Sequence, residues 1–184
     1  AATGVDKEAL HWRPGGILES DFDCHSPGAC PRPSSEFMLR AVWKELADAG
    51  EQILWSIGEQ LGDPDMFDDY HMWEASVLSM FDYKARDPMA AASATAAEAQ
   101  ATRLLEEAHE DRGLLTLIVS VASPSECLQV LPTGGGHGED DWRDADARFN
   151  EGAEGIEVMV LLGHTLEVAT AGKLKACIHR VRCS

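Results

Sequence analysis

Residues 109–119 read His-Glu-Asp-Arg-Gly-Leu-Leu-Thr-Leu-Ile-Val, a polar start that leads into an apolar run. If a β-strand begins here, its two-residue period places His109 and Asp111 on one face and Glu110 on the other. A second imidazole is available far downstream, in His179-Arg180-Val181. Two histidines and one carboxylate form the facial set that holds Fe(II) and leaves half of its octahedron open. We therefore predict a catalytic metal site rather than a closed structural one.

The composition is that of a globular protein. Of the 184 residues, 45% are apolar and 26% are charged, which predicts one domain with a core of ordinary size. The formal net charge of −17 at pH 7 repels phosphate backbones and anionic lipid headgroups. We therefore expect neither nucleic acid nor a membrane as partner, while the oligomeric state is open.

Targeting signals are missing from the sequence. No apolar stretch reaches the length of a membrane span, and residues 1–4 lack the charged and apolar regions of a leader peptide. The five cysteines are odd in number and too sparse for a disulfide scaffold. These features favour a reducing, cytoplasmic setting.

We expect two parts within the one domain, an irregular and helical N-terminal part (residues 1–74) and a β-barrel (residues 75–184). Gly, Pro and Ser predict irregular structure over residues 1–35. Ser34 and Ser35 then open an amphipathic helix that ends at Gly62. Within this helix we expect Trp43 and Trp55 to pack into the core.

The second part is dominated by strand signals. Alanine-rich residues 90–101 with residues 103–107 have helix propensity, and the glycine-rich, acidic residues 133–155 predict an exposed loop. The predicted strands are residues 75–83, 114–121, 127–131, 156–162, 165–170 and 174–181. Helical segments are therefore expected to pack on closely spaced strands.

Five blocks of this second part follow one another in a definite order. They are His109-Glu110-Asp111-Arg112-Gly113, Leu115-Thr116-Leu117-Ile118, Cys127-Leu128-Gln129-Val130, Gly163-His164-Thr165-Leu166 with Thr170-Ala171-Gly172, and His179-Arg180-Val181. The series resembles the isopenicillin N synthase-like, plant-type 2-oxoglutarate and Fe(II) dependent dioxygenases. Their pattern reads H-x-D-x-G, L-T-L-L, G-L-Q-V, G-D-x-L-x-x-x-T-N-G and H-R-V. The resemblance spans residues 75–182, and agreement in order is more specific than any single block.

This resemblance implies a mainly β fold with N-terminal helices, a double-stranded β-helix (jelly roll) that is incomplete at its C-terminus. It implies His109, Asp111 and His179 as ligands of Fe(II), with 2-oxoglutarate as cosubstrate and ascorbate as a candidate reductant. Dioxygen and a small organic molecule would be the other reactants, and the outcome would be hydroxylation, desaturation or ring closure.

The resemblance also implies a role for Tyr83. An N-x-Y strand in the family supplies a tyrosine hydroxyl to the 2-oxoglutarate carboxylate. Here Phe81 stands where that asparagine is expected, and a half-buried strand tyrosine is an equal alternative for Tyr83.

The C-terminus departs from the family pattern. The family places an arginine, in an R-x-S pair about ten residues after the second histidine, against the distal carboxylate of 2-oxoglutarate. Arg182-Cys183-Ser184 spells R-x-S, but Arg182 has the wrong strand parity relative to His179, so the role is not transferred. The family's last strands and much of its N-terminal part are missing, so we expect a partial chain or a reduced relative.

Other reactive side chains carry weaker signals. Cys24, His25 and Cys30 lack a second ligand pair with zinc spacing, and we interpret them as loop residues. We expect His164 at the surface and His137 in solvent within the glycine-rich loop. Cys177 shares strand parity with His179 and is expected to face the interior as a small, apolar-like side chain.

Two functions follow from these observations. The first is a 2-oxoglutarate-dependent dioxygenase acting on a small molecule. The second is a catalytically impaired homologue that uses the barrel as a binding or structural module. Formation of succinate separates the two hypotheses.

Overall fold

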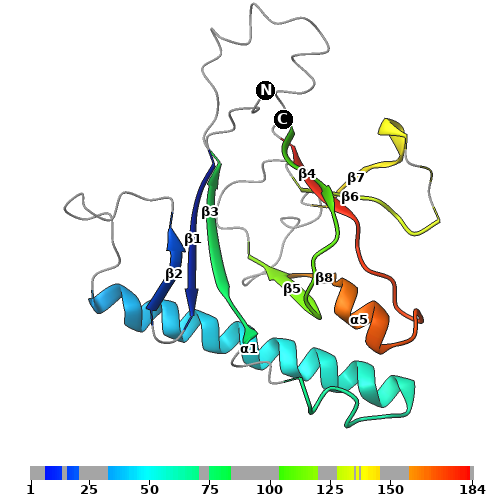
Figure 1. The fold of residues 1–184 in the computed structure, drawn as a ribbon, viewed down its shortest axis with the longest axis horizontal. Helices are drawn as coiled ribbons and strands as arrows, with labels where there is room; N and C mark the ends of the chain where they lie inside the picture. The colour runs from blue at the N-terminus through cyan, green and yellow to red at the C-terminus, as the bar shows by residue number, and fades with distance from the viewer. Residues whose placement is uncertain are drawn as a thin grey trace, which may run out of the picture. The chain divides into compact units, whose positions relative to one another are not determined.

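The computed structural model describes residues 7–13, 16–20, 33–70, 75–83, 104–119, 128–134, 136, 138–145 and 158–182. Two compact units divide the chain, one of Asp6–Lys84 and the other of Ala85–Ser184 with Ala1–Val5. The described elements are mainly β with few helices (Figure 1).

The Asp6–Lys84 unit holds an antiparallel three-stranded sheet. Its strands are β1 (Lys7–Arg13), β2 (Gly16–Ser20) and β3 (Leu78–Tyr83), in the order β2-β1-β3. Strand β3 confirms most of the strand predicted over residues 75–83. Strands β1 and β2 lie where we predicted irregular structure. The Gly and Pro signals marked only the reversal between them, where Arg13 pairs with Gly16.

Helix α1 (Pro33–Leu61) is the long helix of this unit, and its predicted end is confirmed. Gly62 has a φ of 84°, its N–H donates to Glu59 O, and the Asp63 N–H donates to Gly58 O. These bonds form a Schellman motif, in which a left-handed residue satisfies the last carbonyl groups of a helix.

The two tryptophans of α1 have different surroundings. Trp43 is buried, and its Nε1 donates to Ser76 O at 3.4 Å, just before β3. Trp55 is 55% exposed, so the prediction of core packing is wrong for this residue. Leu54, which is buried, lies about three turns after Trp43 and therefore on the same side of α1.

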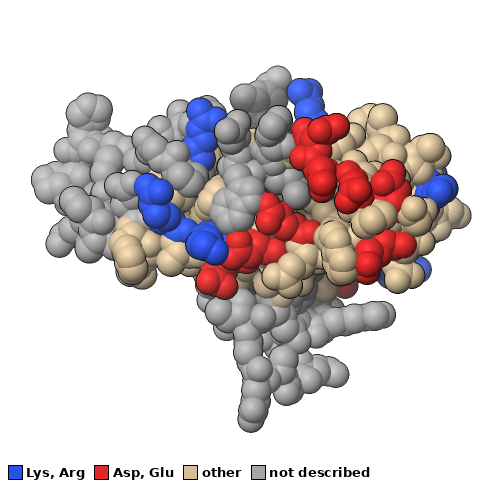
Figure 2. Space-filling view, turned by 90° about the horizontal axis from the view of Figure 1, so that it is seen from below, with Lys and Arg blue, Asp and Glu red and all other residues tan. Residues whose placement is uncertain are grey.

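Acidic residues gather on α1 and the turn that follows it. Figure 2 shows Asp and Glu side chains over much of the face seen from below. The acidic residues of this segment are Glu36, Glu45, Asp48, Glu51, Glu59, Asp63, Asp65, Asp68 and Asp69. Nine of the 32 acidic residues of the chain thus lie in one segment. No helix among the described residues is long and apolar enough to span a membrane.

The other unit contains two sheets. A four-stranded sheet has the order β4-β9-β6-β7, and β5 and β8 form an antiparallel pair. The elements are β4 (Leu104–His109), β5 (Leu115–Ile118), β6 (Leu128–Val130), the 3-10 helix η1 (Glu139–Asp141), β7 (Arg143–Asp144), β8 (Met159–Leu162), α5 (His164–Ala169) and β9 (His179–Arg182). Its buried apolar side chains are Leu128, Leu131, Leu161 and Leu166.

Several strand predictions in this unit are wrong. Residues 165–170 fall mostly in α5, where Leu166 is fully buried and Val168 is 65% exposed, because a helix begins after Gly163 despite the β-branched side chains. Strand β9 begins only at His179, so residues 174–178 are not a strand. Residues 104–107 belong to β4 rather than to a helix, because pairing with β9 overrides local propensity.

Candidate metal site

His109, Asp111 and His179 converge on one point. Each offers one ligand atom, and these atoms all lie within 4.8 Å of one another. His109, the last residue of β4, pairs directly with His179, the first residue of β9. Residues that face each other across antiparallel strands project from the same side of the sheet, and here the ring centroids are 4.3 Å apart.

Asp111 reaches this point from outside a strand. Strand β4 ends at His109 and β5 begins only at Leu115, so the continuous strand predicted from residue 109 is wrong. A turn between the two strands brings the carboxylate back. Asp111 Oδ1 lies 3.6 Å from His109 Nε2, and Asp111 Oδ2 lies 3.8 Å from His179 Nε2.

Both imidazoles present the same nitrogen to the centre. His109 Nδ1 lies 2.7 Å from Glu107 O, and His179 Nδ1 lies 3.0 Å from Cys177 O. A carbonyl oxygen can only accept, so each Nδ1 carries the proton and each Nε2 of a neutral ring keeps a free lone pair. This arrangement, with the second ring nitrogen bonded to the backbone, is the usual one for metal-binding histidines.

The N-terminus of α5 holds the turn that contains Asp111. The His164 N–H donates to Asp111 O at 2.7 Å, and the Thr165 N–H donates to Gly113 O at 3.1 Å. The Gly163 N–H donates to Leu114 O at 2.9 Å. The first N–H groups of a helix have no partner within the helix, and here the carbonyl groups of the turn accept their hydrogen bonds. The family-like G-H-T-L block therefore supports the turn that carries Asp111.

The three side chains differ in exposure. The side chain of His179 is 7% exposed, whereas those of Asp111 and His109 are 26% and 38% exposed. The two imidazoles and the carboxylate fit Fe(II) in chemistry and in number, and they leave room for exogenous ligands.

The sequence predicts positions for two neighbours of the site. The prediction for Cys177 rests on strand parity with His179, which does not apply because β9 begins only at His179. The His164 side chain is 60% exposed, as predicted, and its Nδ1 lies 3.5 Å from Glu110 Oε2. Cys177 is a half-buried free thiol, and burial, with a smaller contribution from the charge of Asp111, raises its pKa above the ordinary value.

Other candidates remain predictions. Tyr83 belongs to the Asp6–Lys84 unit, where its backbone pairs with Lys7, and its side chain lies outside the description. The candidate residues Cys24, His25, Cys30 and His137 lie outside the described residues.

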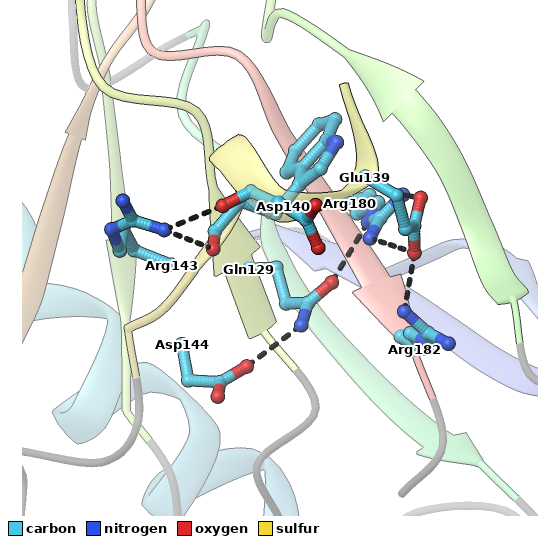
Figure 3. A network of polar contacts seen from close by, with 8 residues as sticks. Gln129, Glu139, Asp140, Arg143, Asp144, Arg180 and Arg182 are labelled. Carbon is cyan, nitrogen blue, oxygen red and sulfur yellow. Dashed lines mark hydrogen bonds and ion pairs between the residues drawn. The ribbon is translucent and has the colours of Figure 1, made fainter. Parts of the chain in front are cut away.

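Arg180 anchors a polar network next to the site (Figure 3). Its guanidinium donates to both carboxylate oxygens of Glu139, at 3.0 and 2.8 Å, and to Gln129 Oε1 at 2.8 Å. It also lies 4.2 Å from the centre of the Trp142 ring. Arg182 donates to the same carboxylate, at 2.5 Å. Arg182, the arginine of the R-x-S motif, therefore pairs with Glu139.

This network was not predicted from the sequence. Glu139 and Trp142 lie in a segment that we predicted only as an exposed loop. Alternation along β9 was the available signal, because Arg180 and Arg182 must share a face opposite to that of His179. A carboxylate to neutralise them was therefore to be expected.

No protein-family model matches the sequence, and no curated protein matches it. Solved structures do share its fold. A full-length Neurospora crassa protein in complex with alpha-KG and 5-formyluracil matches with a TM-score of 0.66 and 18% identity, over 96% of this chain and 50% of that chain. The same Neurospora protein in complex with alpha-KG gives a TM-score of 0.67 and 18% identity, over 97% and 49% of the two chains.

A protein from Shewanella oneidensis, described as a "Putative oxygenase", matches with a TM-score of 0.59 and 19% identity, over 96% of this chain and 55% of that chain. The chain thus spans about half the length of these structures. The likeness shows that the chain shares the fold of these solved structures. It does not single out the isopenicillin N synthase-like subfamily.

Proposed function

We propose that the chain is a non-haem Fe(II) oxidoreductase that uses 2-oxoglutarate to oxidise a small organic substrate. The observation that carries this proposal is the convergence of His109, Asp111 and His179 on one point. The fold supports it, because the same fold occurs in the Neurospora crassa protein bound to alpha-KG, that is, 2-oxoglutarate. The family-like order of the sequence blocks is a third, independent support.

The residues of the chain prepare the site before any reactant arrives. Each histidine ring is oriented by a backbone carbonyl that accepts a hydrogen bond from Nδ1, so that Nε2 faces the centre as the atom that would bind a cation. Asp111 supplies the single negative charge. With dioxygen as the oxidant, Fe(II) held by this set would couple the oxidative decarboxylation of 2-oxoglutarate, to succinate and carbon dioxide, to oxidation of a substrate C–H bond.

The finer assignments are part of the proposal. We place the chain with the isopenicillin N synthase-like enzymes, with a double-stranded β-helix, because of the five ordered blocks. Tyr83 is a candidate contact for the cosubstrate, and ascorbate is a candidate reductant. The Neurospora crassa protein has also been solved with alpha-KG and thymine, which supports a small molecule as the substrate class here.

An impaired homologue is the second candidate. Arg182, the arginine of the R-x-S letters, is engaged by Glu139, so the described residues offer no assigned partner for the distal carboxylate of 2-oxoglutarate. A chain that binds iron but cannot hold the cosubstrate would serve as a binding or structural module.

Anaerobic Fe(II) titration tests the metal site. The wild-type chain should bind one ion, and His179→Ala should abolish this binding because it removes the most buried ligand. Glu110→Ala is the matched control, since it removes a neighbouring charge that is not a ligand. Unchanged Fe(II) affinity in His179→Ala would refute the ligand assignment.

Succinate formation separates the two candidate functions. The iron-loaded chain is mixed with 2-oxoglutarate and oxygen, and succinate is quantified. Succinate that is lost in His179→Ala supports an active oxygenase. Stoichiometric iron binding without succinate favours the impaired homologue.

A further inference from the structure

The two oxygens of Asp111 have different surroundings. Oδ1 is the oxygen nearer to His109 Nε2, at 3.6 Å, and Oδ2 is the one nearer to His179 Nε2, at 3.8 Å. The Thr116 hydroxyl donates a hydrogen bond to Oδ2. One carboxylate oxygen therefore has a protein donor already in place.

The position of that donor is set by the sheet. Thr116 lies within β5 and pairs with Leu161 of β8, a side chain that is only 4% exposed. Asp111 lies in the turn that precedes β5, whose backbone is held by hydrogen bonds from α5, while Thr116 donates to its carboxylate. The hydroxyl can therefore orient the carboxylate.

The proposed chemistry requires such control. A carboxylate can bind a cation through one oxygen or through both. A facial set with three open positions needs one-oxygen binding, because a second oxygen would occupy a position required by 2-oxoglutarate or dioxygen. A hydrogen bond to Oδ2 uses one of its lone pairs and favours metal binding through Oδ1.

We infer that Thr116 is a positioning residue, which holds Asp111 so that it binds the metal through Oδ1 alone. The inference rests on the metal site of the proposed function. Thr116, the threonine of the Leu115-Thr116-Leu117-Ile118 block, then orients a metal ligand in addition to forming part of β5.

Titration with Co(II), a probe whose visible absorption reports coordination geometry, tests this role in the whole chain. Thr116→Val keeps the shape and removes the hydroxyl. Its Kd for Co(II) should rise about 10- to 100-fold, the usual cost of losing an outer-shell partner, and the absorption of bound Co(II) should change. Thr116→Ser restores the hydroxyl and should return both values towards wild type. If Thr116→Val fails to fold, Thr116→Ala removes the hydroxyl with a smaller side chain.

Thr170→Val is the matched control, because the Thr170 hydroxyl donates to Leu166 O and accepts from the Leu174 N–H, and contacts neither the carboxylate nor the turn that contains Asp111. It should leave the Co(II) spectrum unchanged. Equal effects of Thr116→Val and Thr170→Val, or wild-type affinity and spectrum in Thr116→Val, would overturn the positioning role alone. Failure of the wild-type chain to bind Co(II) would overturn the metal site itself.

Discussion

A Cβ atom added to Gly163 would lie 2.2 Å from the carbonyl oxygen of Gly113 and 3.1 Å from that of Asp111. The backbone at Gly163 therefore packs directly against the turn that contains Asp111 and Gly113. Only a residue without a side chain allows this approach, although Gly163 itself has an ordinary φ of −99°.

Gly163→Ala should lower the free energy of unfolding by about 1–3 kcal/mol, the usual cost of overpacking, and should weaken metal binding because the turn must shift. Gly113→Ala is the matched control, since its Cβ would meet only Leu115 O, at 3.8 Å. Chemical denaturation and Co(II) titration give both quantities. A Gly163→Ala chain as stable as Gly113→Ala would contradict the close approach.

Ala171 occupies a backbone conformation that favours glycine. Its φ is 52°, and with Gly172 it forms the turn that ends α5. A non-glycine residue in the left-handed region costs about 1–2 kcal/mol, and a glycine at this position would remove that cost. Part of the stabilisation is offset because glycine has more conformational entropy in the unfolded chain. We expect Ala171→Gly to stabilise the chain by about 0.5–1 kcal/mol in chemical denaturation.

Ala169→Gly, within α5, should instead destabilise the chain by about 0.5–1 kcal/mol, because glycine is unfavourable inside a helix. Opposite signs for these two alanine substitutions are the expected outcome. Destabilisation of equal size at both positions would show that Ala171 is not in the left-handed conformation.

The metal-ligand candidates could be predicted from residue types, because few arrangements other than a metal site bring two histidines and an aspartate into ordered, family-like blocks. The reason for the convergence of these residues could not be predicted from the sequence. We expected one strand to align His109 and Asp111, whereas a turn held by α5 does so. From the sequence, Thr116 could be predicted only as a strand residue, because its contact with Asp111 depends on that turn.

At the scale of elements, the Arg180 network ties η1 to β9, the strand that starts with His179. Its carboxylate should respond to pH. The hydrogen bonds from Arg180, and to a lesser extent the charges of Arg180 and Arg182, lower the pKa of Glu139 below the ordinary 4.5. A lowered folded-state pKa stabilises the fold above pH 4.5, and this contribution is lost as the pH falls through the folded-state value.

Glu139→Gln should therefore be less stable than wild type near neutral pH, and the difference should shrink as the pH falls below 4.5. Denaturation curves at several pH values measure this. Asp140→Asn is the control, because its carboxylate contacts neither arginine in the part of the chain that the structure describes. A stability difference for Glu139→Gln that stays constant with pH would contradict the ion-pair interpretation.

Elements with complete local signals were predictable. Helix α1 had a long apolar period and a glycine stop, and β3 was rich in strand-forming residues. Strands β1 and β2 were hidden by Gly and Pro, which mark turns but also surround short hairpins. Helix α5 was mistaken for a strand because six residues are too few to show a helical period, and its stability comes from burial of Leu166.

At the scale of the whole molecule, metal binding should stabilise the folded chain, because the three ligands meet only when β4, the turn and β9 are in place. A metal ion at about 100 times its Kd adds about 2.7 kcal/mol to the free energy of unfolding. Co(II) should therefore raise the thermal unfolding temperature of the wild-type chain, and a chelator should reverse the rise. No rise is expected for His179→Ala, and a rise equal to that of wild type would place the metal elsewhere.

The chain spans about half the length of the solved structures that share its fold. All three candidate metal ligands lie within one unit of the chain. The metal site can therefore be examined separately from turnover.

The most direct measurement is a crystal structure of the chain soaked anaerobically with Fe(II), with anomalous diffraction recorded at the iron edge. We predict one anomalous peak about 2.0–2.2 Å from His109 Nε2, His179 Nε2 and Asp111 Oδ1, distances typical of first-row metals on nitrogen and oxygen ligands. A peak coordinated by other side chains, or none at saturating Fe(II), would contradict the account.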